Sequence, residues 1–331
     1  MRKIKIAQIG TSKYSHGSQI FDTVCRQKDL FEIVGYALPE NEREKFPEQV
    51  KIFEGYHEMT VEEILNDPQI EAVFVETEEI YLTKYAQMVA ESKKHMHMEK
   101  PGSPCLESFQ KLIETVKKNG TVFHTGYMYR YNPFVKELMQ QIENGELGDI
   151  ISVEAQMNCV HDSEWREWLK NFPGGMLFYL GCHLVDLILQ IQGDPEKIIP
   201  LSCATGVNGI FSEDYGMAVM QYKNGVSFAK TCDIERGGFL RRQLVVTGSK
   251  GTVEIKPLEK VAPGGQVTGR KICLGEDWHV EGATDISAAF ERYDDMMASF
   301  ASYVRGEKQN PYTYDYELKL FKTLLKACGV N

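Results

Sequence analysis

The chain has 331 residues, of which 43% are hydrophobic and 25% are charged, and its formal net charge is −10. This length is too great for one ordinary hydrophobic core and suits two domains of roughly 120–200 residues each. The acidic balance argues against a nucleic-acid partner, because phosphate binding requires clustered Lys and Arg side chains. The start of the chain contains no apolar segment long enough for a signal peptide or a membrane span, so we expect a cytoplasmic protein without a membrane partner.

Cysteine spacing bears on metal binding and on the redox compartment. The eight cysteines occur singly, and no two of them form a Cys-x-x-Cys pair. This spacing indicates neither a zinc site nor a dithiol redox centre, so we expect no bound metal. Free and mostly buried thiols in a reducing compartment are the prediction.

The first third of the chain alternates short apolar runs with longer amphipathic stretches. The apolar runs predict buried strands at 4–9, 31–38, 72–75, 95–98 and 122–127. The amphipathic stretches predict helices at 18–27, 61–66, 82–92 and 105–118. Strands that alternate with helices pair in parallel through right-handed crossovers. The sequence therefore predicts an α/β domain with a Rossmann-type, doubly wound parallel sheet at about 1–125.

The pattern changes after Arg130. A predicted helix is followed by an alternating strand, and further strands flank turns that contain glycine, which is typical of antiparallel hairpins. The helix is expected at 132–144 and the strands at 150–160, 217–222, 226–231, 244–246 and 252–255. We therefore expect an α+β domain at 126–331, built on a mainly antiparallel open sheet with helices on one face. Two final helices, at about 286–304 and 314–326, are expected to pack back on the first domain.

A turn that begins at Gly10 joins the first predicted strand to the first predicted helix. Such a turn points backbone N–H groups at a pyrophosphate beside the positive end of the helix. The dinucleotide fingerprint is G-x-G-x-x-G, and here Ser12 and Ser15 replace its second and third glycines. The cofactor-binding candidates in this turn also include Thr11 and Tyr14. Serine hydroxyls are able to bond phosphate oxygens, and a plain strand-to-helix loop is the alternative.

The second predicted strand is expected to end in an acidic residue that binds the adenosine ribose. Leu38 occupies that position, and Glu40 is the nearest substitute. Arg43 is close in sequence, but the pattern does not show the arginine pocket expected for a 2′-phosphate. NAD is therefore favoured over NADP.

One segment gives a specific resemblance. Residues 95–101, His-Met-His-Met-Glu-Lys-Pro, resemble the K-H-V-x-x-E-K-P segment of the Gfo/Idh/MocA (glucose–fructose oxidoreductase and inositol dehydrogenase) family. Residues 126–133 resemble the R-[FY]-x-P passage of that family, and residues 172–186 resemble its G-G-G-x-L-x-D-x-G-x-H-x-x-D segment. Shorter matches occur at 145–149 and 247–255. The resemblance spans the whole chain and implies an NAD(P)-dependent oxidoreductase that acts on a sugar, cyclitol or related polyol.

The resemblance implies a role for each of several residues. Transfer of a hydride from a carbinol must be coupled to movement of its hydroxyl proton. In the family, the lysine of E-K-P activates the substrate, which places this role on Lys100, and the acid/base role falls on His183. Asp186 would lie on the same helix face as His183 and orient it or the substrate. Tyr179 stands where the family has an aspartate, so it is an acid/base group, a substrate hydrogen-bond donor or only a packing residue. Glu99 is expected to anchor the loop or contact the cofactor.

Other candidate ligand-binding residues flank these segments. Trp165 and Arg166 are predicted to help form a wall against a sugar ring, with ordinary loop packing as the alternative. Tyr127, in the passage to the second domain, is a further substrate-binding candidate. Thr77 occupies the position expected near the nicotinamide ribose, and it is followed by Glu78 and Glu79. Two carboxylates beside a dinucleotide are unfavourable unless they face water or a cationic substrate.

Three functions remain open at this stage. The first is a dehydrogenase or reductase, and the second is a redox-assisted lyase or glycosidase that recycles a tightly bound NAD. The third is a non-catalytic nucleotide sensor with a decayed site, but the presence of both Lys100 and His183 argues against decay. The open face of the predicted second sheet favours a homodimer or homotetramer.

Overall fold

The computed structural model describes residues 2–275 and 278–330. These residues form two compact units. The first unit comprises Met1–Tyr127 and Tyr293–Phe321, and the second comprises Met128–Arg292 and Lys322–Asn331. In the described parts of the chain, no helix is both long enough and apolar enough to cross a bilayer.

The first unit contains a five-stranded parallel sheet. Its strands lie in the order β2-β1-β3-β4-β5, and all neighbouring pairs are parallel. The strands are β1 (Ile4–Ile9), β2 (Phe31–Ala37), β3 (Ala72–Val75), β4 (His95–Met98) and β5 (Phe123–Thr125). The buried runs of β1, β3 and β4 were predicted with the bounds that the structure gives them, and the doubly wound Rossmann sheet is confirmed.

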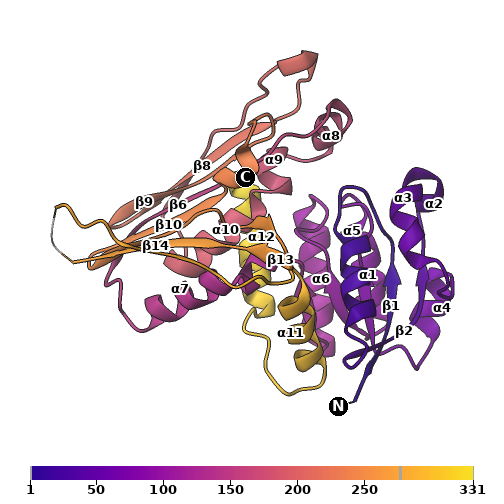
Figure 1. Ribbon diagram of the computed structural model, residues 1–331. Coiled ribbons are helices and arrows are strands. Elements are labelled where there is room, and N and C mark those ends of the chain that lie inside the picture. Colours follow the sequence, from indigo (N-terminus) through magenta and orange to yellow (C-terminus); the bar gives the residue numbers. More distant parts are fainter. Residues whose placement is uncertain (1, 276–277, 331) are drawn as a thin grey trace. The chain divides into compact units, whose positions relative to one another are not determined.

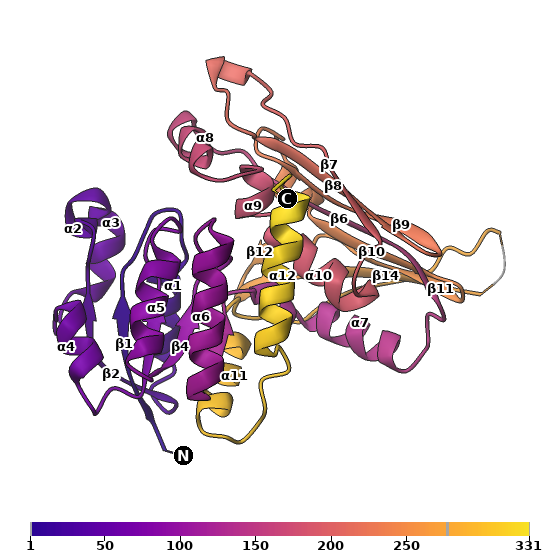
Figure 2. The ribbon, with the colours of Figure 1, turned by 180° about the vertical axis from the view of Figure 1, so that it is seen from behind.

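Helices cover both faces of this sheet. They are α1 (Gly17–Arg26), α2 (Glu42–Lys45), α3 (Pro47–Val50), α4 (Val61–Asn66), α5 (Leu82–Glu91), α6 (Leu106–Asn119), α11 (Asp294–Val304) and the first part of α12 (Tyr314–Ala327). Helices α6 and α12 lie in front of the sheet in Figure 2, and α11 lies on the face seen in Figure 1. Phe300 of α11 packs against Phe74 and His124, whereas Phe109 of α6 stacks on Phe321 of α12. The sheet is therefore buried on both faces, as parallel sheets require.

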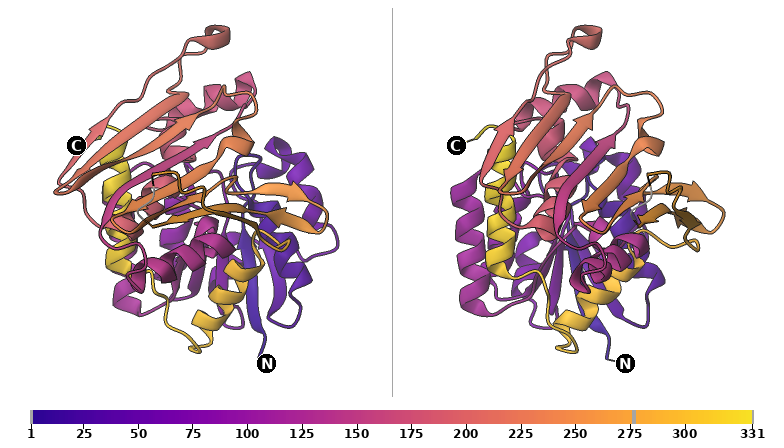
Figure 3. Two further views of the ribbon diagram at one scale, coloured as in Figure 1. Left: turned by 60° about the vertical axis from the view of Figure 1, so that its left-hand side comes forward. Right: turned by 90° about the vertical axis from the view of Figure 1, so that its left-hand side faces the viewer.

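The second unit contains an eight-stranded sheet in the order β15-β14-β11-β10-β6-β9-β8-β7. The strands are β6 (Ile150–Asn158), β7 (Lys197–Pro200), β8 (Tyr215–Tyr222), β9 (Gly225–Cys232), β10 (Gln243–Gly248), β11 (Gly251–Ile255), β14 (Gly269–Leu274) and β15 (Ala283–Ile286). Strands β6 and β9 pair in parallel, and the other neighbouring strands pair antiparallel. Figure 3 shows these strands side by side. The expected mainly antiparallel sheet is confirmed, and a separate hairpin is formed by β12 (Lys260–Ala262) and β13 (Gly265–Val267).

Helices of the second unit pack on this sheet. They are α7 (Pro133–Glu143), α8 (Ser163–Trp168), α9 (Met176–Tyr179) and α10 (Cys182–Gln192). Helix α10 contacts β6 and β9, helix α9 contacts β8 and β9, and helix α7 contacts β11. Alternate residues of the central strands, such as Val153, Ala155 and Met157 of β6, are fully buried. This alternation is the period-two pattern of a half-buried strand, so one face of the sheet forms the core of this unit.

The helix predicted at 286–304 is wrong in its first part. Ile286 belongs to β15, whose residues pair antiparallel with β14. The backbone N–H of Ser287 then donates to the Thr268 carbonyl (3.0 Å), and that of Phe290 donates to the Gln266 carbonyl (2.8 Å). These bonds to distant strands hold residues 283–290 extended, and helix α11 begins only at Asp294. Long-range pairing has overridden a locally helical pattern.

Candidate active site

The turn after β1 can accept only glycine at its first position. Gly10 has φ +86°, a conformation that side chains with a Cβ rarely adopt. A Cβ placed there would lie 2.4 Å from Cγ2 and 2.7 Å from Cα of Thr77. Thr77, which follows β3, therefore packs directly on the turn that precedes α1. The structure thus brings together two of the predicted cofactor-binding residues.

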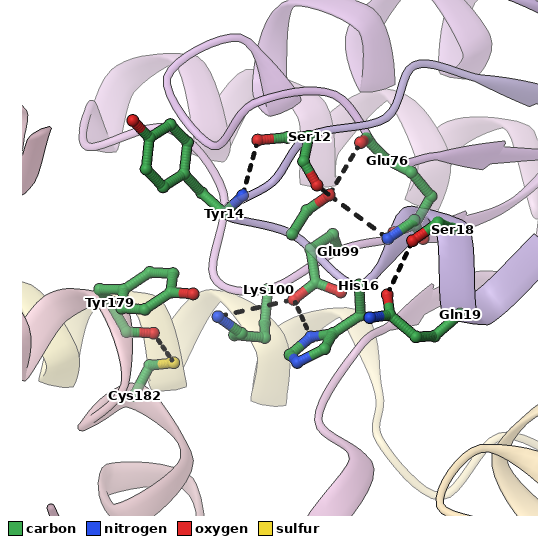
Figure 4. Close-up of polar contacts among 12 residues, drawn as sticks. Ser12, Tyr14, His16, Ser18, Gln19, Glu76, Glu99, Lys100, Tyr179 and Cys182 are labelled. Atoms are coloured by element: carbon green, nitrogen blue, oxygen red, sulfur yellow. Dashed lines mark hydrogen bonds and ion pairs between the residues drawn. The ribbon is translucent and has the colours of Figure 1, made fainter. Parts of the chain in front are cut away.

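The serine hydroxyls of the turn are used to shape it. Ser12 Oγ accepts a hydrogen bond from the Tyr14 N–H (3.0 Å), and Ser15 Oγ donates to the Glu76 carbonyl (3.2 Å). Figure 4 shows the first of these bonds, between Ser12 and Tyr14. Helix α1 begins at Gly17 and has no acidic residue in its first turn. The positive end of its dipole is therefore not neutralised by the chain itself, which suits an anionic ligand.

A buried acid, missed by the sequence analysis, lies beside the same turn. Glu42 is 1% exposed, and its Oε2 accepts a hydrogen bond from the Thr11 N–H (3.2 Å). Burial raises the pKa of Glu42 to about 9, against the smaller lowering effect of that bond, so the carboxyl is neutral at pH 7. Glu42 lies in helix α2, which has four residues. A helix of about one turn is too short to show a periodic pattern that would indicate an inward-facing side chain.

The end of β2 carries an ionised acid. Leu38 packs against the core cluster of Phe21, Tyr36, Val50 and Phe53. Glu40 Oε1 accepts hydrogen bonds from Lys84 Nζ (2.5 Å) and Tyr85 Oη (2.7 Å). These two donors hold the pKa of Glu40 below its usual value. Glu40 is therefore negatively charged at neutral pH, whereas Leu38 contributes an apolar surface.

The Glu-Lys-Pro segment follows β4 and is buried. Lys100 is fully buried, and its Nζ lies 3.5 Å from Glu99 Oε1. The same oxygen lies 3.7 Å from His16 Nδ1 (Figure 4). Burial by itself would raise the pKa of Glu99, but His16 and Lys100 outweigh it and hold that pKa below its usual value. The Glu99 carboxylate is therefore the counter-ion of the Lys100 ammonium.

Two further carboxyl groups, those of Glu76 and Glu79, interact electrostatically with Lys100. Burial raises the pKa of Glu79 to about 8, although Lys100 opposes the shift. Burial, and then the charges of Glu99 and Glu79, raise the pKa of Glu76 well above its usual value. Both carboxyls are therefore predominantly neutral at pH 7. The sequence analysis expected Glu78 and Glu79 to face water or a cation if they lie beside a dinucleotide. Glu79 is 1% exposed and Glu78 is 8% exposed, so neither side chain faces water. Protonation of Glu79 removes the expected repulsion instead.

In the second unit, Tyr179 lies among aromatic rings. It ends α9 and is 5% exposed. Its ring centroid lies 5.3 Å from that of Trp168, 6.0 Å from that of Trp165 and 6.5 Å from that of His161. The Tyr179 carbonyl accepts a hydrogen bond from Cys182 Sγ (3.3 Å, Figure 4), which joins α9 to α10. Trp165, which was predicted to help form a sugar-facing wall, and Trp168 therefore flank Tyr179.

His183 and Asp186 both lie on α10 and are buried. The ring of Tyr129 packs edge-on against His183 at 5.1 Å. The Asp186 carboxylate accepts two hydrogen bonds from Arg130, from Nε (2.9 Å) and Nη2 (2.8 Å), and a third from Gln190 (2.8 Å). Asp186 is thus engaged by a bidentate arginine, which anchors α10 to the start of the second unit.

Arg166 is likewise engaged within the fold. It is 2% exposed and pairs through Nη2 (2.5 Å) and Nε (3.2 Å) with Asp214 Oδ2. Its Nη2 also donates to the Val207 carbonyl (2.9 Å), so these contacts favour a structural role over the predicted substrate contact.

Tyr127, the remaining substrate-binding candidate, lies in the first unit, two residues after the end of β5, and is 2% exposed.

The fold and these groups define a class of protein, an NAD(P)-binding oxidoreductase. Residues 4–127 match the family model of the oxidoreductase family with an NAD-binding Rossmann fold, and residues 135–254 match that of the GFO/IDH/MocA C-terminal domain. The two matches cover most of both units. This chain belongs to the GFO/IDH/MocA family of oxidoreductases, as the sequence resemblance predicted.

Individual relatives are distant. The uncharacterized oxidoreductase YhhX of Escherichia coli K12 is 29% identical over 156 residues, which are 46% of this chain and 44% of that protein, so the match spans less than half of this relative. A trans-1,2-dihydrobenzene-1,2-diol dehydrogenase of Mus musculus is 24% identical over 308 residues, 88% of this chain and 86% of that protein. A structure of levoglucosan dehydrogenase with NADH and levoglucosan has the same fold, with TM-score 0.80 at 16% identity over 99% of this chain and 98% of that one.

Proposed function

We propose that this protein transfers a hydride between a nicotinamide cofactor and a ring carbinol of a sugar, cyclitol or related polyol. The observation that carries the proposal is the buried Lys100 ammonium at the end of β4, with Glu99 as its counter-ion. Lysine is almost never fully buried without a specific partner or task. The carboxyl end of the strands of an open parallel sheet is also where such folds bind ligands.

The first unit fits a dinucleotide. Its turn has the required glycine at Gly10, and α1 begins without an acidic residue in its first turn. The Thr11 hydroxyl is buried and has no hydrogen-bond partner within the described chain, so it is ready to bond a ligand atom. The pyrophosphate would be held by the turn, the adenosine by the end of β2, and the nicotinamide ribose by Thr77 and Glu99. The residues of the turn are Gly10, Thr11, Ser12, Tyr14 and Ser15.

Glu40 and Leu38 at the end of β2 favour NAD over NADP. The ionised Glu40 carboxylate can accept hydrogen bonds from ribose hydroxyls, whereas it would repel a 2′-phosphate. Purified enzyme should therefore show a higher kcat/KM with NAD than with NADP. A preference for NADP would show that neighbouring cations such as Lys84 control this end of the site.

Lys100 is the group proposed to act on the substrate oxygen. When bound, the nicotinamide supplies the acceptor or donor of the hydride. The ammonium polarises a carbonyl during reduction and stabilises the developing alkoxide during oxidation. Because Glu76 and Glu79 are largely neutral, Glu99 is the one ionised carboxylate among these three that faces the lysine charge. The site therefore keeps its cation available for an oxygen that gains negative charge.

In the second unit, His183 is the proposed acid/base group, with Tyr179 as a second proton-transferring or hydrogen-bonding group. An imidazole can accept a proton at one ring nitrogen and donate one from the other, which suits general acid/base chemistry. The Arg130–Asp186 pair fixes α10, which carries His183. Asp186 is therefore proposed to orient this helix rather than to act on substrate directly. The rings of Trp165 and Tyr179 offer apolar faces to the C–H groups of a sugar ring.

Relatives support the substrate class. One acts, by its name, on trans-1,2-dihydrobenzene-1,2-diol, and another was crystallised with levoglucosan. Both compounds carry secondary hydroxyls on a six-membered ring. We extend this shared chemistry, and not either compound, to the present enzyme.

The test begins with the cofactor that the purified protein retains or binds. We expect net NADH formation with one or more members of a panel of cyclic polyols. Lys100→Met should lower kcat by roughly a thousandfold and leave NAD binding in place. The matched control is Lys111→Met, on the exposed face of α6, which should keep the wild-type rate. Cleavage of a substrate without net change in cofactor would instead favour the redox-assisted lyase, and absence of nucleotide binding would refute both.

We also propose that the second unit forms a homo-oligomer through the open face of its sheet. One row of paired residues crosses five neighbouring strands of this face, and all its members are half-buried. In order from β8 to β11 the row is Val219, Phe228, Glu154, Val245 and Glu254. Such a face buries apolar area when a second copy covers it. Light scattering on the full chain should give a dimer or tetramer, and Phe228→Glu should reduce that mass. A monomeric wild type would contradict this proposal.

A further inference from the structure

Three potential metal ligands meet in the second unit, at the carboxyl ends of β6 and β9. Cys159 and His161 follow β6, and Asp233 follows β9, its parallel neighbour. The Cys159 N–H donates to the Cys232 carbonyl (3.0 Å), and the His161 N–H donates to the Asp233 carbonyl (3.3 Å). Because Cys159 and His161 are two residues apart on extended chain, their side chains point to the same side. The sheet thus fixes the backbone of all three residues.

Their ligand atoms are spaced much as a tetrahedral metal site requires. Zinc bonds of ~2.3 Å to sulfur and ~2.0–2.2 Å to nitrogen or oxygen imply ligand–ligand separations of roughly 3.4–3.6 Å. Cys159 Sγ lies 3.6 Å from His161 Nδ1 and 3.2 Å from Asp233 Oδ1. His161 Nδ1 and Asp233 Oδ1 lie 2.5 Å apart. Insertion of an ion requires this last pair to separate by about 0.9 Å, which a small rotation of the Asp233 carboxylate supplies.

The local environment also favours a ligand. Asp233 is fully buried, and its second oxygen, Oδ2, is buried without a hydrogen-bond partner among the described residues. An oxygen in that state costs free energy unless a cation or donor reaches it. The His161 ring stacks on Trp165 with a centroid distance of 4.2 Å and an interplanar angle of 4°, so its orientation is fixed. Side-chain exposure is 22% for His161, which leaves a route from solvent.

We propose that Cys159, His161 and Asp233 bind one divalent metal ion of the zinc class and leave its fourth coordination position open. Thiolate, imidazole and carboxylate together are a donor set for a borderline-soft ion, whereas Mg²⁺ and Ca²⁺ prefer oxygen ligands alone. On binding, the thiol proton passes to water, and the imidazole coordinates through a nitrogen that carries no proton. The open position accepts a water molecule or another oxygen ligand.

Such a site is independent of the proposed hydride transfer. It would tie the chain after β6 to the chain after β9 and would hold His161, whose ring lies 6.5 Å from that of Tyr179. The proposed site also differs from the expectation, based on cysteine spacing, that no metal is bound. Spacing did not indicate it, because Cys-x-His is too short a pattern to be specific and Asp233 is 72 residues beyond His161 in the sequence.

Cobalt(II) is a suitable probe for this site, because it takes tetrahedral coordination and reports sulfur ligation by absorption. The purified full chain is freed of metal with a chelator and titrated with Co²⁺. We expect a thiolate-to-cobalt charge-transfer band that saturates at one equivalent, and its loss when Zn²⁺ is added. Zn²⁺ alone should also raise the thermal unfolding temperature of the wild type.

Two variants test the proposed ligands, and a third serves as the control. Cys159→Ser should abolish the charge-transfer band, and His161→Gln should weaken Co²⁺ binding by at least roughly tenfold. Cys203→Ser, which removes an exposed cysteine elsewhere in the chain, is the matched control and should leave both properties unchanged. Circular dichroism of each variant verifies folding, and His161→Gln, at a part-exposed loop position, tests the proposal even if the cysteine variant misfolds. A wild type without the band, or a band that survives in folded Cys159→Ser, would show that the three side chains form only a hydrogen-bonded cluster.

Discussion

Buried charges are arranged differently in the two units. In the second unit, each of three buried arginines makes close contacts with a carboxylate: Arg130 with Asp186, Arg166 with Asp214, and Arg242 with Glu259. In the first unit, one lysine lies among several acids. Lys100 contacts Glu99, and the nearby Glu76 and Glu79 have raised pKa values.

This difference separates charges that hold the fold from charges that are available for chemistry. A buried arginine with a bidentate or near-bidentate carboxylate is neutralised within the protein and offers little to a ligand. A buried ionisable group whose charge is only partly balanced by its neighbours has a shifted pKa. Such groups are concentrated at functional sites. The comparison therefore favours Lys100 as the proposed reactive cation and a structural role for Arg166.

The largest expected effect comes from breaking one of the arginine pairs. Arg166→Met leaves the Asp214 carboxylate buried without its cation, which should lower the free energy of unfolding by about 3–5 kcal/mol. Denaturant unfolding of the full chain measures this loss. Arg26→Met is the control, because Arg26 pairs with Asp22 and Asp294 at the surface and should contribute about 1 kcal/mol or less. A higher KM with unchanged unfolding would return Arg166 to substrate binding.

A smaller effect is expected from removal of the buried acid beside Lys100. Folded Glu79 keeps its proton up to about pH 8, whereas the unfolded chain releases it near pH 4.5. The folded state therefore binds more protons between these pH values, so its stability falls as the pH rises through this window. Glu79→Gln removes that fall and should gain on the order of 3 kcal/mol at pH 7, with little change at pH 4.

Unfolding curves at several pH values measure the Glu79 effect, with Glu114→Gln on the surface of α6 as the control. A pH dependence that is the same in Glu79→Gln and in the wild type would show that Glu79 is ionised in the folded protein. The first unit would then hold its acids by charge pairing, as the second unit does.

The smallest effect is expected at Tyr179. Tyr179→Phe removes the phenol but keeps the ring among Trp165 and Trp168, so stability should change little. The rate of hydride transfer should fall about tenfold, which corresponds to about 1.4 kcal/mol in activation free energy. Steady-state kinetics measures this fall, with Tyr222→Phe on β8 as the control. A wild-type rate would make Tyr179 a packing residue.

The sequence predicted those parts of the fold whose signals are local. Ile4–Ile9, Ala72–Val75 and His95–Met98 are short apolar or buried runs between turns, and the structure gives them the predicted bounds. Helix α10 was expected at His183 and Asp186 but was given no bounds, because it is apolar on nearly every side.

Of the candidate site, the sequence indicated Lys100, Glu99 and the turn at Gly10 through motifs. It did not indicate Glu42 or Asp233. The Glu42 contact with Thr11 joins residues 31 apart, and the Asp233 contact with Cys159 joins residues 74 apart. Such contacts depend on the order of strands in a sheet, which spacing along the chain does not reveal.

The first unit is completed by a segment that is synthesised long after its sheet. Phe300 of α11 covers Phe74, His97 and His124, which lie on one face of the parallel sheet. Until that segment leaves the ribosome, this face has no cover from α11, although all five strands have already emerged. The nascent Rossmann unit therefore gains this cover only after more than 160 residues of the second unit have been synthesised.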